Sequence, residues 1–292
     1  MQKSNISWYL ILISTFMVWG TQHPPLKILS GEIDPFLFNF LRYSIAGLAL
    51  APFILKNKIS VEKKDLTKIL FLGFVGISLF GVLNFVGVKL STATNNAVLL
   101  NSWPLLAVFI APLLIGEKIT KKAVVATLIG FAGVILVTTQ GIGIGNLLKS
   151  EFFAGNILIL LSGLCLAFYS IFSKKYIKKY GSLNTTFYAI LAASIILLFL
   201  SILRQNLFSI TQISLNSLLL VLWVALPTTA LTYVVWFKSI DKIGLVKTNS
   251  FFFLIPISGI LTSAIFLNEK ITYFTVLGTL LILTGIYTLQ RN

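Results

Sequence analysis

One stretch of the chain occurs twice, and the two copies are 152 residues apart. Residues 104–120 recur as residues 256–272, and each copy begins with proline and ends in Glu-Lys-Ile-Thr. The same register continues further along the chain, where it pairs Gly133 with Gly285. Because the spacing is about half of the 292 residues, the fold should consist of two similar units in tandem.

The composition indicates in which solvent these units fold. Hydrophobic residues make up 57% of the chain and charged residues 11%, whereas a soluble domain carries about 25% charged residues. Runs of about 20 apolar residues span a membrane as helices, and no strand-like alternation suggests a barrel. The sequence predicts an all-α integral membrane protein with ten transmembrane helices. These are residues 8–27, 36–55, 68–88, 96–115, 122–139, 153–173, 185–203, 216–237, 246–266 and 273–289.

The distribution of basic residues predicts how the chain crosses the membrane. If the N-terminus is cytoplasmic, 17 of the 23 Lys and Arg residues lie in cytoplasmic segments, as the positive-inside rule requires. We therefore expect a multi-pass protein of the plasma membrane with both termini in the cytoplasm. The lysines flank spans and accompany no recognition motif, so the net charge of +15 favours contact with membrane lipids and argues against binding of nucleic acid.

Five spans in each half is an odd number, so the second half should enter the membrane inverted relative to the first. The loop charges agree: the loop after the second span has five lysines, whereas its counterpart after the seventh has only Arg204. We expect residues 1–140 to form the first five-helix repeat and residues 153–292 the second, inverted one. Residues 141–152 would be an extracytoplasmic connector. Inverted repeats are typical of secondary transporters, which bind solutes between the two halves.

The chain resembles the EamA type of the drug/metabolite transporter superfamily. The resemblance lies in Trp19-Gly20 at the end of the first span, Arg42 early in the second, and the doubled segments from proline to Glu-Lys. It implies ten helices in two inverted repeats around a central cavity, and often the export of amino acids or other metabolites. One departure is the run Thr-Gln-His-Pro-Pro after Gly20, where small or aliphatic residues are usual.

Polar residues inside membrane spans are costly and therefore candidates for function. Four of them lie at a similar depth, about 6–10 Å below the outer boundary: His23, Arg42, Asn84 and Asn101. They could bind a carboxylate-bearing or polar solute. Alternatively they form hydrogen bonds between helices, with Arg42 directed outward or paired with Glu32 or Asp34.

Aromatic and hydroxyl side chains complete the predicted substrate site. Its wall would include Trp19, Trp103, Tyr169, Thr229 and Tyr233. Prolines at corresponding places in the halves predict kinked helices around a cavity. The residues expected to act in gating are Pro104, Pro227, Pro256 and Asn249.

Absent motifs narrow the function further. The chain has no phosphate-binding G-x-x-x-x-G-K-[ST] loop and no catalytic arrangement, and it contains one His and one Cys, so we expect no cofactor, no metal site and no enzyme activity. The eight acidic residues lie in loops or at span ends, which leaves no carboxylate relay at the membrane midplane. The sequence favours a secondary transporter, exporter or facilitator of a small-molecule substrate. The alternative is a membrane protein that does not transport, either an assembly partner or a lipid-modifying enzyme.

Overall fold

The computed structural model describes residues 2–57, 60–106, 108, 120–140, 151–205, 207–243 and 250–290, and every regular element within these ranges is helical. The helices of the first half are α1 (Gln2–Gly20), α2 (His23–Glu32), α3 (Pro35–Asn57), α4 (Lys63–Gly73), η1 (Phe74–Leu79), α5 (Phe80–Lys89), α6 (Ala93–Leu100) and α8 (Lys121–Thr139). Those of the second half are α9 (Phe153–Tyr180), α10 (Ser182–Leu203), η3 (Leu207–Gln212), α11 (Leu215–Ala225), η4 (Leu226–Leu231), α12 (Thr232–Ile243), η5 (Ser250–Phe253), α14 (Leu254–Leu267) and α15 (Tyr273–Gln290).

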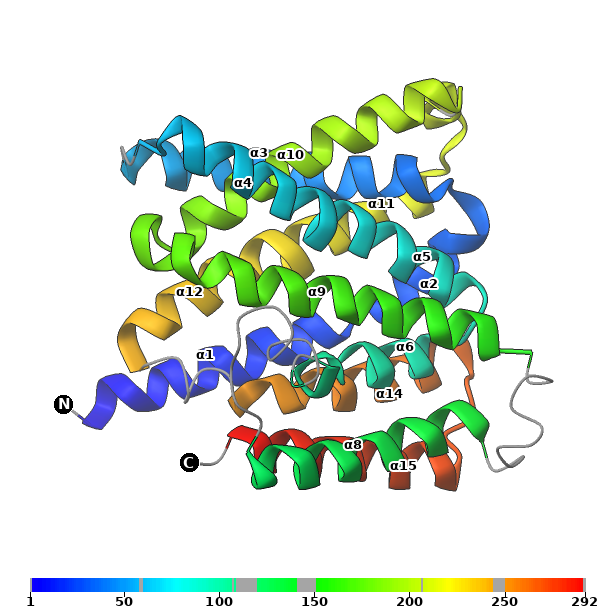
Figure 1. The fold of residues 1–292 in the computed structure, drawn as a ribbon. Coiled ribbons are helices and arrows are strands. Elements are labelled where there is room, and N and C mark those ends of the chain that lie inside the picture. The colour runs from blue at the N-terminus through cyan, green and yellow to red at the C-terminus, as the bar shows by residue number, and fades with distance from the viewer. Residues whose placement is uncertain are drawn as a thin grey trace.

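The helices lie side by side in one bundle (Figure 1). Helix α1 begins and α15 ends at the same end of this bundle, on the left of the figure, which we name the terminal end. Helices α2 and α5 finish at the opposite end, where α9 and α15 begin; we name it the distal end.

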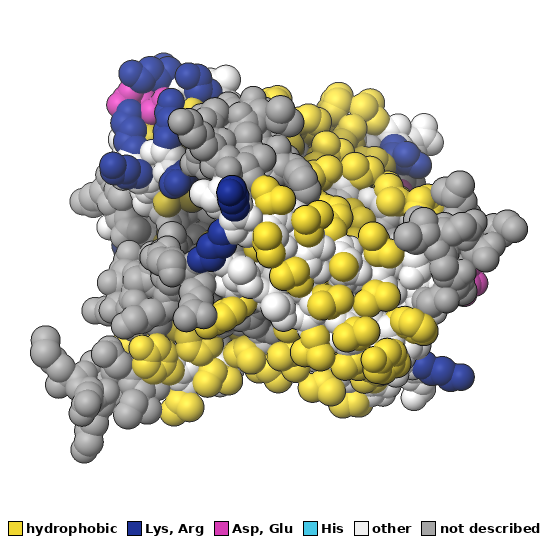
Figure 2. Space-filling model, turned by 60° about the horizontal axis from the view of Figure 1, so that its bottom comes forward, with side chains coloured by type: hydrophobic (Ala, Val, Ile, Leu, Met, Phe, Trp, Pro, Cys, Tyr) yellow, Lys and Arg dark blue, Asp and Glu magenta, His cyan; other side chains and the backbone are white. Residues whose placement is uncertain are grey.

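Length, composition and surface identify a multi-pass membrane protein. Six segments among the described residues are long and apolar enough to cross a bilayer: Pro35–Lys56, Lys63–Lys89, Lys121–Thr139, Phe153–Tyr180, Ser182–Leu203 and Leu215–Trp236. Helices α14 and α15 are also apolar but shorter. Many large hydrophobic side chains face outward, with Leu48 and Leu55 at least 75% exposed. Figure 2 shows such side chains covering the middle of one face, while Lys and Arg gather mainly at its left end.

The segment expected as one span over residues 8–27 is two helices. Helix α1 ends at Gly20 and α2 begins at His23 after a turn. Pro24 and Pro25 occupy the first turn of α2, where the missing N–H of proline costs nothing, but where each would interrupt a continuous α1. The prolines therefore explain the break, and this break places the side chains of the candidate site.

The sequence repeat has a structural counterpart in two π-helical segments. Six residues of π-helix, η1 (Phe74–Leu79), separate α4 from α5, and six more, η4 (Leu226–Leu231), separate α11 from α12. The two segments are 152 residues apart, as are the two copies of the repeated sequence. A π-segment inserts one extra residue into an α-helix and is frequent at functional sites. The 152-residue spacing thus also relates the α4–η1–α5 segment to the α11–η4–α12 segment. Both lie outside the part of the sequence where the repeat is visible, 104–133 and 256–285.

Helices α8 and α15 pack closely through small residues that obey the same register. A Cβ on Gly133 would lie 2.4 Å from the carbonyl oxygen of Gly278, and a Cβ on Gly285 would lie 2.6 Å from that of Ala126. The 152-residue spacing of the repeat relates these two contacts to each other, because it pairs Gly133 with Gly285 and Ala126 with Gly278. Backbones this close require glycine, as at other interfaces between membrane helices.

Candidate functional site

The break between α1 and α2 faces a buried arginine on α3. Arg42, 7% exposed, donates from Nε to Thr229 Oγ1 (3.1 Å) and from one Nη to Gln22 Oε1 (3.0 Å). The Thr229 hydroxyl donates in turn to the carbonyl of Val224 (2.7 Å), one of the backbone acceptors around the π-segment η4. Arg42 thereby joins three elements from both halves: α3, the α1–α2 break and η4.

Next to this arginine, a chain of side-chain hydrogen bonds ends on His23. Asn84 Nδ2 donates to Asn96 Oδ1 (2.7 Å), and Asn96 Nδ2 lies 3.1 Å from His23 Nδ1. All three side chains are at most 3% exposed. Because Asn96 uses its oxygen to accept from Asn84, its amide N–H must be the donor to His23. The second ring nitrogen, His23 Nε2, has no hydrogen-bond partner among the residues that the structure describes.

An aromatic cluster lies about one helical turn from Gln22 and Thr229, the two hydrogen-bond partners of Arg42. Trp19 precedes Gln22 by three residues, and Tyr233 follows Thr229 by four. The rings of Trp19 and Tyr233 meet edge-to-face with their centroids 5.7 Å apart. Trp236 and Phe252 also contact Trp19, at 6.3 and 5.5 Å between ring centroids. The polar groups around Arg42 thus adjoin an apolar, aromatic wall.

The structure brings together some of the predicted site residues and separates others. It joins Arg42 to Thr229, His23 to Asn84 through Asn96, and Trp19 to Tyr233. Asn101 instead donates to the carbonyl of Ala97 (2.7 Å) in its own helix. A four-residue back-bond of this kind satisfies the amide locally, so Asn101 is not part of the hydrogen-bond chain on His23.

Tyr169 and Trp103 lie on other helix contacts. The Tyr169 hydroxyl is 3.4 Å from Thr186 Oγ1, and the Tyr169 side chain packs against Gly76 in η1, where a Cβ would lie 2.2 Å from it. Trp103 packs near Gly163 of α9. Both residues remain candidates for the cavity wall through the helices they contact, and their role in binding stays a prediction.

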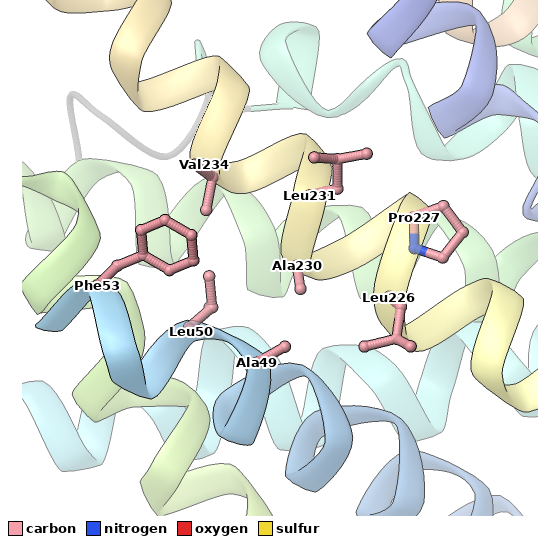
Figure 3. A pocket seen from close by; sticks show the side chains of 8 residues that line it. All are labelled: Ala49, Leu50, Phe53, Leu226, Pro227, Ala230, Leu231 and Val234. Carbon is pink, nitrogen blue, oxygen red and sulfur yellow. The ribbon is translucent and has the colours of Figure 1, made fainter.

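The prolines expected to act in gating lie in different environments. Pro227 lines an apolar groove of about 390 Å³ between α3 and the η4–α12 segment (Figure 3). The other lining residues are Ala49, Leu50, Phe53, Leu226, Ala230, Leu231 and Val234. Pro256 is buried in α14, and Pro104 follows the turn that ends α6. Asn249 lies outside the described residues.

Arg42 makes neither of the ion pairs that the sequence left open as alternatives. Glu32 accepts a hydrogen bond from the Ser217 hydroxyl. Asp34 accepts from the N–H groups of Phe36 and Leu37 at the start of α3, and Arg204 Nε lies 3.9 Å from it. Both acids therefore have partners elsewhere at the distal end, and the burial of Arg42 shows that it is not directed outward.

Two residues of the site were missed in the sequence. Gln22 accepts from Arg42, and Asn96 connects Asn84 to His23. Both are amides at positions counted within apolar spans, 8–27 and 96–115, which is the signal that selected Asn84 and Asn101. Gln22 also stands in the run Thr-Gln-His-Pro-Pro that departs from the family pattern.

Lysine and acidic side chains connect the halves at the terminal end. Lys179 Nζ of α9 lies 2.6 Å from a Glu62 oxygen and 2.8 Å from an Asp65 oxygen. Hydrogen bonds from Lys179, and then from Lys64, lower the pKa of the exposed Glu62 carboxyl. The contacts of the ionised Glu62 carboxylate with Lys179 and Lys64 therefore stabilise the protein at neutral pH. This stabilisation is lost as the pH falls through the lowered pKa of Glu62.

At the distal end, two charged side chains bind backbone groups. Lys27 Nζ donates to carbonyl oxygens at the end of α5 and in the turn that follows, those of Val88 (3.0 Å), Lys89 (2.9 Å) and Ser91. Glu269 accepts from the N–H groups of Ala93 (2.8 Å) and Thr94 (2.7 Å) in the first turn of α6. A cation at a helix C-terminus and an anion at a helix N-terminus both stabilise the helix. Glu269 belongs to the second copy of the repeated segment, so a residue of the second half stabilises the start of α6 in the first half.

Comparison with known proteins assigns the chain to a family. The sequence model of the EamA-like transporter family matches residues 6–139 and again residues 153–290. The chain belongs to this family, which confirms the resemblance seen in the sequence.

Several relatives match over almost the whole chain. An uncharacterized transporter of Bacillus subtilis (strain 168), YyaM, is 26% identical over 97% of this chain and 93% of its own. An uncharacterized transporter of Archaeoglobus fulgidus is 25% identical over 97% of both chains. The WAT1-related protein At3g02690 of Arabidopsis thaliana, described as chloroplastic, is 25% identical over 96% of this chain and 68% of its own. A solved crystal structure at 18% identity has the same fold, with a TM-score of 0.66 over 96% of this chain and 95% of the other.

Proposed function

We propose that this protein is a secondary transporter, exporter or facilitator that moves small metabolites, amino acids among them, across the cytoplasmic membrane. It does so by alternating access around a site between two inverted repeats of five transmembrane helices. The repeats are residues 1–140 and 153–292, joined by the extracytoplasmic connector 141–152. Membership of the EamA-like transporter family supports transport, and the two family matches, 6–139 and 153–290, support the boundaries.

The observation that carries the proposal is a set of buried polar side chains, Arg42, Gln22, His23, Asn84 and Asn96, in a bundle with three interrupted helices. The interruptions are the α1–α2 break and the π-segments η1 and η4. Arg42 lies between the α1–α2 break and the π-segment η4, and its hydrogen bonds cross from the first half to the second. The matching π-segment η1 packs against Tyr169 of α9. Broken helices that surround polar groups at membrane depth are typical of transporter binding sites. The residues we propose to contact substrate are Trp19, His23, Arg42, Asn84, Asn101, Trp103, Tyr169, Thr229 and Tyr233.

We infer the orientation of the protein in the membrane from the distribution of its basic residues. The terminal end carries most of the Lys and Arg residues, and we place it in the cytoplasm of a plasma-membrane protein. Contacts between the halves at the two ends, Lys179 with Glu62 and Glu269 with α6, are suited to open alternately. Pro104, Pro227 and Pro256 would let the helices bend during this exchange, and we propose that Asn249 also acts in gating.

Flux through the purified protein tests the function. Proteoliposomes loaded with a panel of radiolabelled amino acids and organic acids should release at least one solute faster than protein-free liposomes of the same lipid. Without a carboxylate at midplane depth, we expect uniport or weak coupling to a proton gradient, with His23 as the titrating group. No flux of any solute would support the alternative of an assembly partner, and altered phospholipids in the same vesicles would indicate a lipid-modifying enzyme.

A further inference from the structure

We propose that the solute bound at this site is a carboxylate with a net negative charge, held by the guanidinium of Arg42, with its apolar part against the aromatic cluster. The inference rests on the proposed function, because it specifies the substrate class of the same site. It depends on the charge balance around Arg42, on the excess of hydrogen-bond donors there and on the position of the aromatic rings.

Among the described residues, Arg42 has no carboxylate to neutralise it. Its two hydrogen bonds go to neutral oxygens, those of Thr229 and Gln22. The described carboxylates with assigned contacts lie at the ends of the bundle and bind other groups: Glu32, Asp34, Glu62, Asp65 and Glu269. Asp241 is twelve residues beyond Thr229 in the sequence, about 18 Å further along the η4–α12 segment.

An arginine buried at membrane depth without an opposite charge is unfavourable, because neutral dipoles compensate only part of the lost hydration. An anion that enters beside it restores neutrality. Arg42 therefore favours a negatively charged solute over a neutral one of the same shape, and the preference is larger in this apolar surrounding than it would be in water.

Hydrogen bonding at the site points in the same direction. Arg42 has five N–H donors, and two of them have acceptors among the described residues. The amide chain from Asn84 through Asn96 makes His23 Nδ1 an acceptor, so the proton of a neutral His23 ring is on Nε2. That nitrogen is fully buried and lacks a described partner. The unused polar groups of Arg42 and His23 are thus N–H donors, which require oxygen acceptors such as those of a carboxylate.

The position of the aromatic cluster defines the rest of the solute. Trp19 and Tyr233 lie one turn from Gln22 and Thr229, about 5 Å along the helices, and their rings touch. A carboxylate on Arg42 can therefore place a small apolar or aromatic body on these rings. No described carboxylate lies beside them to pair with an ammonium group, so anionic carboxylates should bind more tightly than zwitterionic amino acids.

Benzoate and benzamide provide a matched pair of probes, since they have the same shape and differ in charge. We would measure thermal stabilisation and quenching of tryptophan fluorescence for the purified protein in detergent, at constant ionic strength. Benzoate should bind the wild-type protein at least about ten-fold more tightly than benzamide, and more tightly than phenylalanine. Equal affinities for benzoate and benzamide would overturn the proposal.

Variants at two arginines assign the preference for benzoate to a residue. Arg42→Met should remove the preference for benzoate and should not lower the melting temperature measured without added carboxylate, because it removes an uncompensated charge. Arg204→Met, at the exposed arginine of the distal end, should keep the full preference. If Arg42→Met does not fold, Arg42→Lys should bind benzoate more weakly than wild type but still prefer it to benzamide. An unchanged benzoate preference in Arg42→Met, or in Arg42→Lys where only that variant folds, would overturn the assignment.

The binding measurement needs no transport, so the two proposals can fail separately. Benzoate binding that depends on Arg42, together with no flux of any solute, would contradict the function and leave the anion site in place. Flux of neutral or zwitterionic solutes, with equal affinity for benzoate and benzamide, would leave the function in place and contradict the anion site.

Discussion

At the scale of the residue, two charged side chains at the distal end bind the backbone groups of helix ends. Lys27 binds three carbonyl oxygens at the C-terminal end of α5, and Glu269 binds two N–H groups at the start of α6. Helix ends leave such groups without partners. Near a membrane boundary less water is available to form hydrogen bonds with these backbone groups. A long charged side chain from a neighbouring helix forms them instead.

Replacing Lys27 should therefore destabilise the protein. We expect Lys27→Met to lower the melting temperature by about 2–6 °C in thermal unfolding, because carbonyl groups of Val88, Lys89 and Ser91 lose their donor. The exposed Lys89 offers a matched control on the same turn, and Lys89→Met should change the melting temperature by less than about 1 °C. Equal melting temperatures for the two variants would show that water replaces the ammonium group.

At the scale of the element, the two π-segments mark where each half can change shape. Both η1 and η4 contain one residue more than an α-helix needs over the same length. Deleting the extra residue lets the segment become α-helical while the helices on either side keep their relative orientation. A change to α-helix with the residue retained would instead rotate one of these helices by about 100° relative to the other. Deleting the extra residue therefore tests whether a π-segment is needed for transport or is only tolerated by the fold.

Deletion of Leu79, an exposed residue of η1, should convert the segment to α-helix and keep the faces of α4 and α5 in register. We expect the variant to fold with a melting temperature near that of wild type, and to lose most of its flux in proteoliposomes. Deletion of Leu70 in α4 is the control, since it rotates the rest of the helix by about 100° and should prevent folding. Normal flux after deletion of Leu79 would show that the π-segment is not required for transport.

At the scale of the whole molecule, the distribution of lysines predicts the orientation of the protein in the membrane. Ser60, before α4 at the terminal end, and Ser209, in η3 at the distal end, are both exposed. In a Cys165→Ser background, an impermeant maleimide should label Ser209→Cys in intact cells. It should label Ser60→Cys only after permeabilisation, because we propose that the lysine-rich end faces the cytoplasm. The reverse pattern would invert the proposed topology.

Much of this architecture is predictable from the sequence alone. The apolar runs predict a helical membrane protein because lipid leaves backbone groups no other partner, and the family match confirms the class. The repeat of 152 residues predicts two similar halves, and the π-segments follow the same register. The number of ten spans and the inversion of the second half stay predictions.

The candidate site shows what the sequence could not provide. Depth counting placed His23, Arg42, Asn84 and Asn101 in one layer, but depth does not say which way a side chain points around its helix. The break at Thr21–Gln22 turns Gln22 toward Arg42 and His23 toward Asn96, whereas Asn101 binds its own helix. Composition and periodicity determined the helices, since these depend on local apolar patterns. Only tertiary packing decided which polar groups meet, because those contacts join residues up to 187 positions apart.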